Sequence, residues 1–254
     1  TIRNTLMGLF GFLKKKPVFE PADLGVLHTD IHSHFIPGID DGAATMEDTI
    51  ALLREMQGFG YKKVITTPHV MSDYYKNTPE IILGGLNDVR EQIEKEDGLD
   101  IEIEAAAEYN IDADFESKIE KKEVLTFGDN YVLVEMPFIQ EPMNLKDILF
   151  KLQMDGYKPV MAHVERYPFW HQSYEKIIEI KERGILLQLN INSLTGFYGP
   201  MVKKIAERLV DDRVITLLGS DCHHLNHVEL MKKSLTVPHL HYLLGQDQLI
   251  NKTL

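Results

Sequence analysis

Three features that would direct this chain toward other functions are scarce in its sequence. Cysteine occurs once in 254 residues, as Cys222, so no disulfide can form within the chain and a cytoplasmic location is expected. No apolar run approaches the roughly 20 residues of a bilayer-spanning helix, so no transmembrane segment is expected. Lys and Arg number 27 against 39 Asp and Glu. The resulting net charge of −12 argues against a nucleic-acid partner, because carboxylates repel phosphate.

Residues 1–20 form an N-terminal extension in which an apolar stretch precedes three lysines. A secretory signal has its positive charge first, so a signal peptide is not expected. Two interpretations stay open: a short helix packed on the body of the protein, or a docking segment for a partner or membrane surface. Residues 21–254 contain no Pro/Gly/Ser-rich linker and are predicted to form a single domain.

Short β-rich runs and segments of helical period alternate along the rest of the chain. The runs are apolar, as expected of strands buried on both faces, and lie at 26–31, 63–67, 101–107, 131–135, 159–162, 185–189 and 214–218. Helices are expected from an N-cap at Thr45, over 79–96, 114–122 and 144–155, from Ser173 to a stop at Gly184, over 200–211, and in part over 228–251 with a break near Pro238. This alternation indicates an α/β protein with a parallel sheet, either a closed barrel or a doubly wound open sheet.

Histidines and carboxylates follow six of the seven runs at the same end. In chain order the polar residues are His32, His34, Asp40, Asp41, His69, Glu108, Glu135, His163, Asn190, Asn192, Asp221 and His223. In a (β/α) barrel the carboxyl ends of all strands meet at one mouth, whereas in an open sheet the chemistry gathers at a single switch point. The spread of these residues over so many runs therefore favours the barrel.

Carboxylates crowded into a partly dry pocket repel one another unless they take up protons or bind cations. Imidazole and carboxylate donors without thiolate suit Mn²⁺, Fe²⁺ or Zn²⁺, and the donors here are too many for one ion. Two or three ions are expected, an arrangement that serves in-line attack on phosphorus. Each motif alone is weak evidence, because an isolated His-x-His or a Glu at a strand end is often a hydrogen-bonding or salt-bridge residue. The whole set in this order is specific.

The ordered motifs resemble the polymerase and histidinol phosphatase (PHP) superfamily. They read Asp30-Ile-His-Ser-His34, Gly38-Ile-Asp-Asp-Gly42, Thr67-Pro-His69, Ala107-Glu-Tyr109, Ala162-His-Val-Glu-Arg-Tyr167 and Ser220-Asp-Cys-His223. Within the superfamily, roughly residues 27–250 are similar to bacterial manganese-dependent protein-tyrosine phosphatases of capsule and exopolysaccharide systems. The resemblance implies the PHP fold, a distorted seven-stranded (β/α)7 TIM-like barrel, with two or three divalent metal ions, Mn²⁺ first and Fe²⁺ or Zn²⁺ as alternatives.

The resemblance also implies a role for each site residue. The implied metal ligands are His32, His34, Asp41, His69, Glu108, Glu135, His163, Asp221 and His223. Glu108 would be the carboxylate that bridges two ions. Of the two adjacent aspartates, Asp41 matches the family's metal-ligand position and Asp40 does not. Arg166 matches the arginine that contacts the substrate phosphate during catalysis; an ion pair with a nearby carboxylate is the alternative interpretation.

One departure from the family concerns a second arginine that relatives often carry after the Asp-x-His motif. This chain has none there. His224, His227 and Lys232 are the candidates to replace it, and for each of them a solvated loop position is the alternative.

The implied function is a metal-dependent protein-tyrosine phosphatase in which a metal-bound hydroxide attacks phosphotyrosine in line with the leaving phenolate. The expected substrate is a tyrosine-phosphorylated protein such as the tail of a bacterial tyrosine kinase in capsule or exopolysaccharide regulation. A cysteine mechanism needs an arginine six positions after Cys222, where the sequence has Val228. A histidinol-phosphate-type small-molecule phosphatase and a degenerate, structural PHP module remain alternatives.

Overall fold

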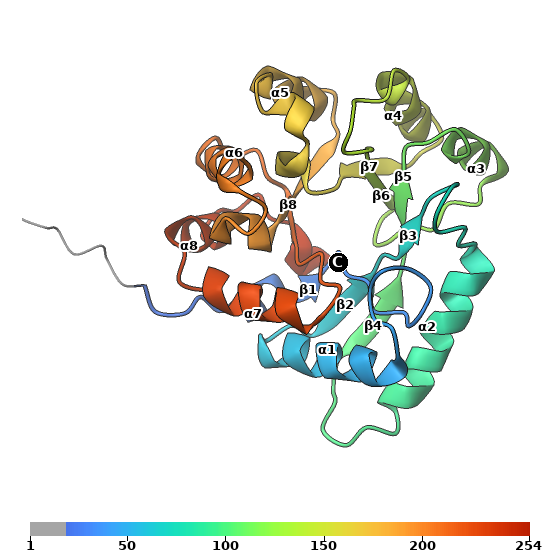
Figure 1. Ribbon diagram of the computed structural model, residues 1–254, viewed down its shortest axis with the longest axis vertical. Coiled ribbons are helices and arrows are strands. Elements are labelled where there is room, and N and C mark those ends of the chain that lie inside the picture. The colour runs from blue at the N-terminus through green and yellow to red at the C-terminus, as the bar shows by residue number, and fades with distance from the viewer. Residues whose placement is uncertain (1–18) are drawn as a thin grey trace, which may run out of the picture.

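The computed structural model describes residues 19–254, and the hypotheses on the N-terminal extension fall almost wholly outside them. Helices surround the strands when the molecule is viewed as in Figure 1. None of the helices within the described residues combines the length and the apolar character that a membrane crossing needs.

All of the paired strands run parallel, and they form two sheets. The smaller sheet has the order β1 (Thr29–Asp30), β2 (Lys63–Thr66) and β4 (Glu102–Ala105). The larger sheet has the order β3 (His69–Val70), β5 (Glu108–Asn110), β6 (Tyr131–Glu135), β7 (Lys158–Met161), β8 (Leu186–Asn190) and β9 (Leu217–Gly219). The α/β class with a parallel sheet is therefore confirmed, whereas one continuous sheet of seven strands is not what the pairing shows.

The predicted sheet is divided because two of the predicted strands are interrupted and the chain passes from one sheet to the other. The predicted run 63–67 contains β2, but Pro68 has no N–H to donate to a ladder, and past it β3 pairs in the other sheet. The run 101–107 likewise contains β4 and is followed by β5 in the larger sheet. Each of these two runs thus supplies a strand to the smaller sheet, and the residues directly after it supply a strand to the larger sheet.

The first predicted run, 26–31, is mostly not a strand. Residues Leu24–Leu27 form a short 3-10 helix, and only the two residues of β1 pair with a neighbour. The Asp23 carboxylate accepts a hydrogen bond from the Gly25 N–H and caps this turn, and His28 then adopts a positive φ of 64°. The strand can begin only after that reversal.

The two sheets meet between the segments that follow β1 and β9. Ser33 and Cys222 form a parallel bridge, the His34 N–H donates to the Cys222 carbonyl at 3.0 Å, and the Asp221 N–H donates to the His32 carbonyl at 2.8 Å. The first and last polar motifs of the chain therefore lie side by side.

Apolar side chains pack on both faces of these strands. One buried cluster contains Ile31, Ile65, Leu133, Val160 and Leu217, drawn from segments of both sheets. Neighbouring residues on the same strands, such as Val64 and Val132, belong to the larger core that packs against the helices. This alternation explains why the β runs are almost continuously apolar.

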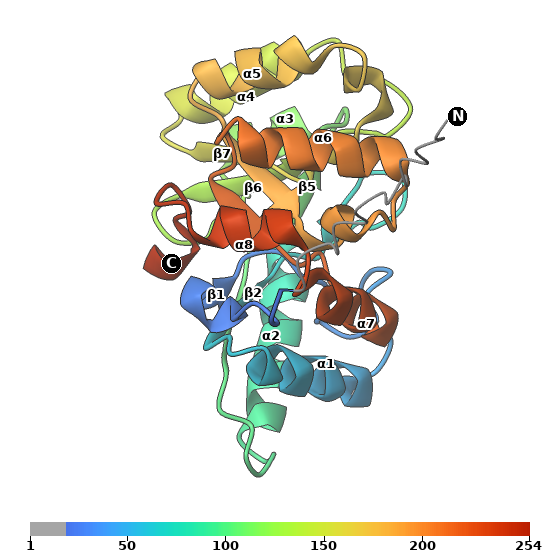
Figure 2. The same cartoon turned by 90° about the vertical axis from the view of Figure 1, so that its left-hand side faces the viewer.

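The helices lie close to their predicted residue ranges. They are α1 (Met46–Gly58), α2 (Pro79–Ile93), α3 (Phe115–Lys121), α4 (Leu145–Met154), α5 (Tyr174–Glu182), α6 (Pro200–Asp211), α7 (Leu225–Ser234) and α8 (Pro238–Leu244). Figure 2 shows α1 and α2 beside the smaller sheet and α4, α5 and α6 beside the larger one.

The helix ends test the predicted caps. Thr45 and Asp48 form a reciprocal capping box at the start of α1, as predicted. Ser173 occupies the N-cap position of α5, but its side chain makes no capping hydrogen bond, so that part of the prediction was wrong. Gly184 follows α5 with a φ of 85°, and Pro238 begins α8, whereas α7 starts three residues before the predicted boundary of 228.

Candidate metal centre

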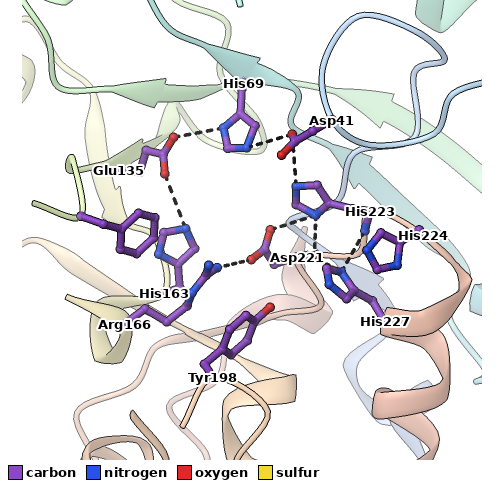
Figure 3. Close-up of a pocket in the computed structure, with 11 residues that line it drawn as sticks. Asp41, His69, Glu135, His163, Arg166, Tyr198, Asp221, His223, His224 and His227 are labelled. Atoms are coloured by element: carbon purple, nitrogen blue, oxygen red, sulfur yellow. Dashed lines mark hydrogen bonds and ion pairs between the residues drawn. The ribbon is translucent and has the colours of Figure 1, made fainter. Parts of the chain in front are cut away.

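A pocket of about 280 Å³ lies at the carboxyl ends of the strands, and Figure 3 shows its side chains pointing toward one another. Its lining includes Asp41, His69, Glu135, His163, Arg166, Asp221 and His223, all predicted site residues, together with His224, His227, Phe138 and Tyr198. The other predicted ligands, His32, His34 and Glu108, are fully buried and contact residues of this lining. The structure thus brings all nine predicted ligands to one place.

The deepest group, called here the floor cluster, consists of His32, His34, Glu108 and Asp221. Their ligand atoms all lie within 4.8 Å of one another. His32 Nε2 lies 3.1 Å from Glu108 Oε2 and 3.3 Å from Asp221 Oδ1. His34 Nε2 lies 3.5 Å from each of the same two oxygens. Two imidazoles and two carboxylates therefore face a common point.

A second group, the mouth cluster, consists of His34, Asp41, His69 and His223. Asp41 Oδ1 lies 3.5 Å from His69 Nε2 and 3.6 Å from His223 Nε2. The Asp41 side chain is 55% exposed, so this group opens to solvent. The loop that carries Asp41 closes at Gly42, where a Cβ would lie 2.1 Å from the His34 carbonyl oxygen, which explains the glycine.

A third group joins His69, Glu108 and Glu135. His69 Nδ1 lies 3.2 Å from Glu108 Oε2 and 3.0 Å from Glu135 Oε1. His163 Nε2 lies 3.0 Å from the other Glu108 oxygen, Oε1. The two oxygens of Glu108 therefore face different imidazoles, the placement that a bridging carboxylate requires.

The donor set fits divalent cations. His69 Nδ1 and Glu135 Oε1 are buried and close together, yet neither has a partner in hydrogen-bond geometry. A buried polar atom without a partner is costly, and here the unpaired atoms converge instead of pairing. Imidazole nitrogens mixed with carboxylate oxygens are the ligands that Mn²⁺, Fe²⁺ and Zn²⁺ accept.

Opposite charges shift the pKa values in this group. Burial favours the neutral carboxyl, but the charge of His32 holds the pKa values of Glu108 and Asp221 well below their usual range. Burial likewise opposes protonation of His69, but the charge of Glu108 raises its pKa to about 9. Protons therefore compete with cations for these ligand atoms.

Two further residues orient the imidazoles. Asp40 Oδ2 lies 2.8 Å from His34 Nδ1 and accepts a hydrogen bond from the His69 N–H at 3.0 Å, so His34 presents Nε2 to the cluster. Gln188 Oε1 accepts from the His163 N–H at 2.8 Å and lies 3.2 Å from His32 Nδ1. In the sequence, Asp40 is distinguished only as a non-ligand beside Asp41, and the one signal for Gln188 is an amide inside an apolar β run.

Arg166 forms one wall of the pocket. It donates to Asp221 Oδ2 at 2.6 Å, so the ion pair considered as an alternative is present. Its guanidinium lies 5.0 Å from the centre of the Phe138 ring and 4.2 Å from that of Tyr198, while 20% of the side chain stays exposed. Sequence reasoning missed both aromatic residues, because neither stands in a recognisable motif.

The three candidates to replace a second arginine lie in different places. Lys232 pairs with Glu55 and Glu229 on the surface and does not line the pocket. His224 and His227 do line it. His227 Nδ1 accepts a hydrogen bond from the His223 N–H at 3.2 Å, and burial lowers the His227 pKa to about 4, so the ring is neutral.

Cys222 does not line the pocket. Its thiol is fully buried, and burial raises its pKa far above the ordinary value. A protonated, inaccessible thiol cannot act as a nucleophile. The residue is a buried, space-filling side chain between Asp221 and His223.

Comparison with known proteins adds a family and named relatives. The model of the family "Capsular polysaccharide synthesis, CpsB/CapC" matches residues 28–238. The tyrosine-protein phosphatase YwqE of Bacillus subtilis is 31% identical over 197 residues, which is 77% of each chain. The tyrosine-protein phosphatase CpsB of Streptococcus pneumoniae is 30% identical over 203 residues, covering 78% of this chain and 83% of that one.

A solved structure also matches. It comes from a crystallographic description of YwqE from Bacillus subtilis and CpsB from Streptococcus pneumoniae as unique metal-dependent tyrosine phosphatases. The TM-score is 0.77 at 28% identity, and the match covers 89% of this chain and 90% of that one. The shared fold therefore extends over nearly all of the described residues.

Proposed function

This chain belongs to the CpsB/CapC family of capsular polysaccharide synthesis, and from that premise we propose that it is a metal-dependent protein-tyrosine phosphatase acting in capsule or exopolysaccharide regulation. One observation carries the proposal. The fully buried Glu108 faces imidazoles with both of its oxygens, His32 on one side and His163 on the other, in a pocket that also holds Arg166. Such a donor set suits divalent cations, and the adjoining guanidinium suits phosphate.

The proposal includes two or three divalent ions, Mn²⁺ first, with Fe²⁺ or Zn²⁺ as alternatives. The residues that would hold them are His32, His34, Asp41, His69, Glu108, Glu135, His163, Asp221 and His223. Such ions lower the pKa of water and withdraw negative charge from phosphoryl oxygens. Asp40 and Gln188 keep the His34 and His32 rings turned toward the donors around them.

Arg166 is proposed to bind the phosphate. Its planar fork suits two phosphate oxygens, and its contacts with Asp221 and the rings of Phe138 and Tyr198 fix its orientation before substrate arrives. A guanidinium that is already oriented stabilises the charge of the transition state without reorganising during the reaction.

His227 is proposed to donate a hydrogen bond where relatives use a second arginine. Nδ1 lies 3.2 Å from the His223 N and 3.1 Å from the Asp221 carbonyl oxygen; in the proposed tautomer Nδ1 accepts from the His223 N–H and the proton is on Nε2. His227 lines the pocket, which supports a role of this N–H toward a phosphate oxygen or the leaving phenolate. The phenol of tyrosine has a pKa of ~10, so its phenolate is a better leaving group than an alkoxide and needs less proton donation. A weak donor therefore suffices.

The finer architecture and setting belong to the same proposal. We take residues 21–254 as one domain in which the two sheets form a distorted barrel, closed between β1 and β9. The barrel is seven-stranded when β2 with β3, and β4 with β5, are each counted as one interrupted strand. The bridge between Ser33 and Cys222 and the apolar cluster shared by both sheets support this closure. A cytoplasmic location is included, as is a substrate in the tail of a bacterial tyrosine kinase.

The test combines metal analysis with a phosphatase assay. The purified protein is analysed for metals, and phosphate release is measured from a phosphotyrosine peptide, a phosphoserine peptide and histidinol phosphate. We expect bound transition metal, fastest release from phosphotyrosine, loss of activity after EDTA treatment and recovery with Mn²⁺. Full activity after verified metal removal would contradict the metal requirement, and preferred turnover of histidinol phosphate would contradict the substrate.

A further inference from the structure

A second hollow lies beside the catalytic pocket on the Arg166 side. Its volume is about 420 Å³, and Phe138, Arg166 and Tyr198 line both hollows. Its other walls include Pro168, Pro200 and Met201. We call this hollow the flanking groove.

The flanking groove differs from the pocket in chemistry. Most of its walls are apolar, and among the described residues that line it there is no Asp or Glu, although the chain carries a net charge of −12. Met201 is 48% exposed and Phe138 is 41% exposed. Large apolar side chains exposed together beside a polar site are typical of a surface that binds something.

The walls of the groove come from three segments that follow strands of the larger sheet. Phe138 follows β6, Pro168 starts the short 3-10 helix Pro168–Trp170 after β7, and Pro200 occupies the first turn of α6. Gly199 precedes Pro200 with a φ of 107°, a conformation that favours glycine. The groove is therefore preformed at the same carboxyl ends that carry the metal centre.

We propose that the flanking groove binds an apolar side chain of the substrate protein, two residues away from the phosphotyrosine. This rests on the proposed function, because it places the phosphate in the adjoining pocket. In an extended segment, side chains two positions apart point to the same side and are separated by about 6.5–7 Å. A phosphotyrosine in the pocket therefore directs the side chain two positions away toward the neighbouring groove, across the wall formed by Phe138, Arg166 and Tyr198.

The groove is expected to act on binding rather than on the chemical step. Its own walls, Pro168, Pro200 and Met201, do not line the catalytic pocket and so do not contact the phosphate placed there. An interaction of this kind lowers KM and leaves kcat nearly unchanged. The flanking residue of the substrate thereby determines which phosphotyrosines are used.

The test compares phosphotyrosine peptides that carry Leu or Ser at position −2 or +2. We expect a kcat/KM about 10- to 100-fold higher for Leu at one of these two positions, mainly through KM. Met201→Glu, at the exposed start of α6, is expected to remove most of this preference, and Met201→Leu is expected to keep it. Hydrolysis of p-nitrophenyl phosphate, which has no flanking residues, is expected to stay the same in both variants.

Met154→Glu is the matched control, since it adds the same charge at an exposed methionine on the last turn of α4 and outside the groove lining. Equal use of the Leu and Ser peptides at both positions by the unmodified protein would overturn the proposal. A Met201→Glu variant that slows p-nitrophenyl phosphate as much as the peptides would overturn it too, because the groove would then hold the phenyl ring itself.

Failure of the proposed function has a different signature. In that case no aryl phosphate is hydrolysed, and because the peptides survive, their binding to the same protein can be measured by fluorescence anisotropy. Tighter binding of the Leu peptide, lost in Met201→Glu, would still support the groove. Equal binding of both peptides would overturn it.

Discussion

The floor and the mouth of the pocket use the same donor types but are built differently. Floor residues follow β1 and β9 or begin β5, and backbone hydrogen bonds link the first two of these segments. Asp41 of the mouth cluster comes from a loop and is 55% exposed, whereas Glu108 of the floor cluster has no exposed surface. Water can replace a lost oxygen at the mouth but cannot replace one at the floor, so equivalent substitutions should differ in severity.

The largest effect is expected from Glu108→Gln at the floor. The amide keeps the shape of the side chain but removes the charge that both facing imidazoles and the cations require. Activity on phosphotyrosine should fall by more than about 100-fold, beyond the usual cost of losing an outer-shell partner, and metal content should fall with it. Metal analysis and phosphate release measure the two effects.

Glu104→Gln is the matched control for that substitution. Glu104 lies four residues earlier, on β4, and pairs with Lys63 at 2.8 Å away from the pocket. Its loss should leave activity and metal content unchanged. Full activity in Glu108→Gln, or an equal loss in both variants, would show that the floor cluster is not the site of the reaction.

Arg166→Ala should have the next largest effect. Removing a preoriented cation from a developing oxyanion typically costs about 10²- to 10³-fold in rate, and substrate binding should weaken as well. The metals should remain bound, because Arg166 is not among their ligands. Steady-state kinetics with metal analysis separates this result from the floor result, and unchanged kcat and KM would remove Arg166 from the mechanism.

Asp41→Asn should cost less, because the mouth is open to water. We expect a loss of about tenfold in activity, largely recovered at high Mn²⁺ concentration. A titration of activity against Mn²⁺ for this variant and for Glu108→Gln makes the comparison direct. If Asp41→Asn is as severe as Glu108→Gln and does not respond to Mn²⁺, the distinction between floor and mouth fails.

The smallest effect is expected from Cys222→Ala. The thiol is buried and takes no part in the proposed reaction, so kcat and KM should stay the same, and thiol-alkylating reagents should leave the unmodified protein active. The small cavity should lower the free energy of unfolding by about 1 kcal/mol, measurable by urea denaturation. Loss of turnover in a folded Cys222→Ala protein would contradict the metal mechanism.

Local patterns in the sequence were sufficient to predict most elements. The N-cap at Thr45 and the break in the helical stretch near Pro238 depend on neighbours within a few residues, and both are present. The turn at Leu24–Leu27 and the transfer of the chain between sheets at Pro68 were not predicted, because the apolar residues around them hide the Asp23 cap and the missing N–H of Pro68. Which sheet each strand joins depends on pairing with distant segments.

The same division applies to the site. The predicted ligands could be found because each follows a β run and all such ends meet in a parallel fold; their roles as ligands remain predictions. Gln188, Phe138 and Tyr198 escaped detection because their importance depends on which ring or guanidinium packs against them. Such contacts between distant segments leave no periodic signal in the sequence.

The junction between the two ends of the β/α series has a consequence for biosynthesis. The Ser220 hydroxyl and N–H donate to Asp30, 190 positions earlier, and Asp221 reaches His32 only through this junction. A nascent chain still lacking these residues holds His32, His34 and Glu108 without Asp221, the second carboxylate of the floor cluster. If the floor cluster binds cations as proposed, it is complete only late in translation, and a product truncated before Ser220 would lack both this junction and the Asp221 ligand.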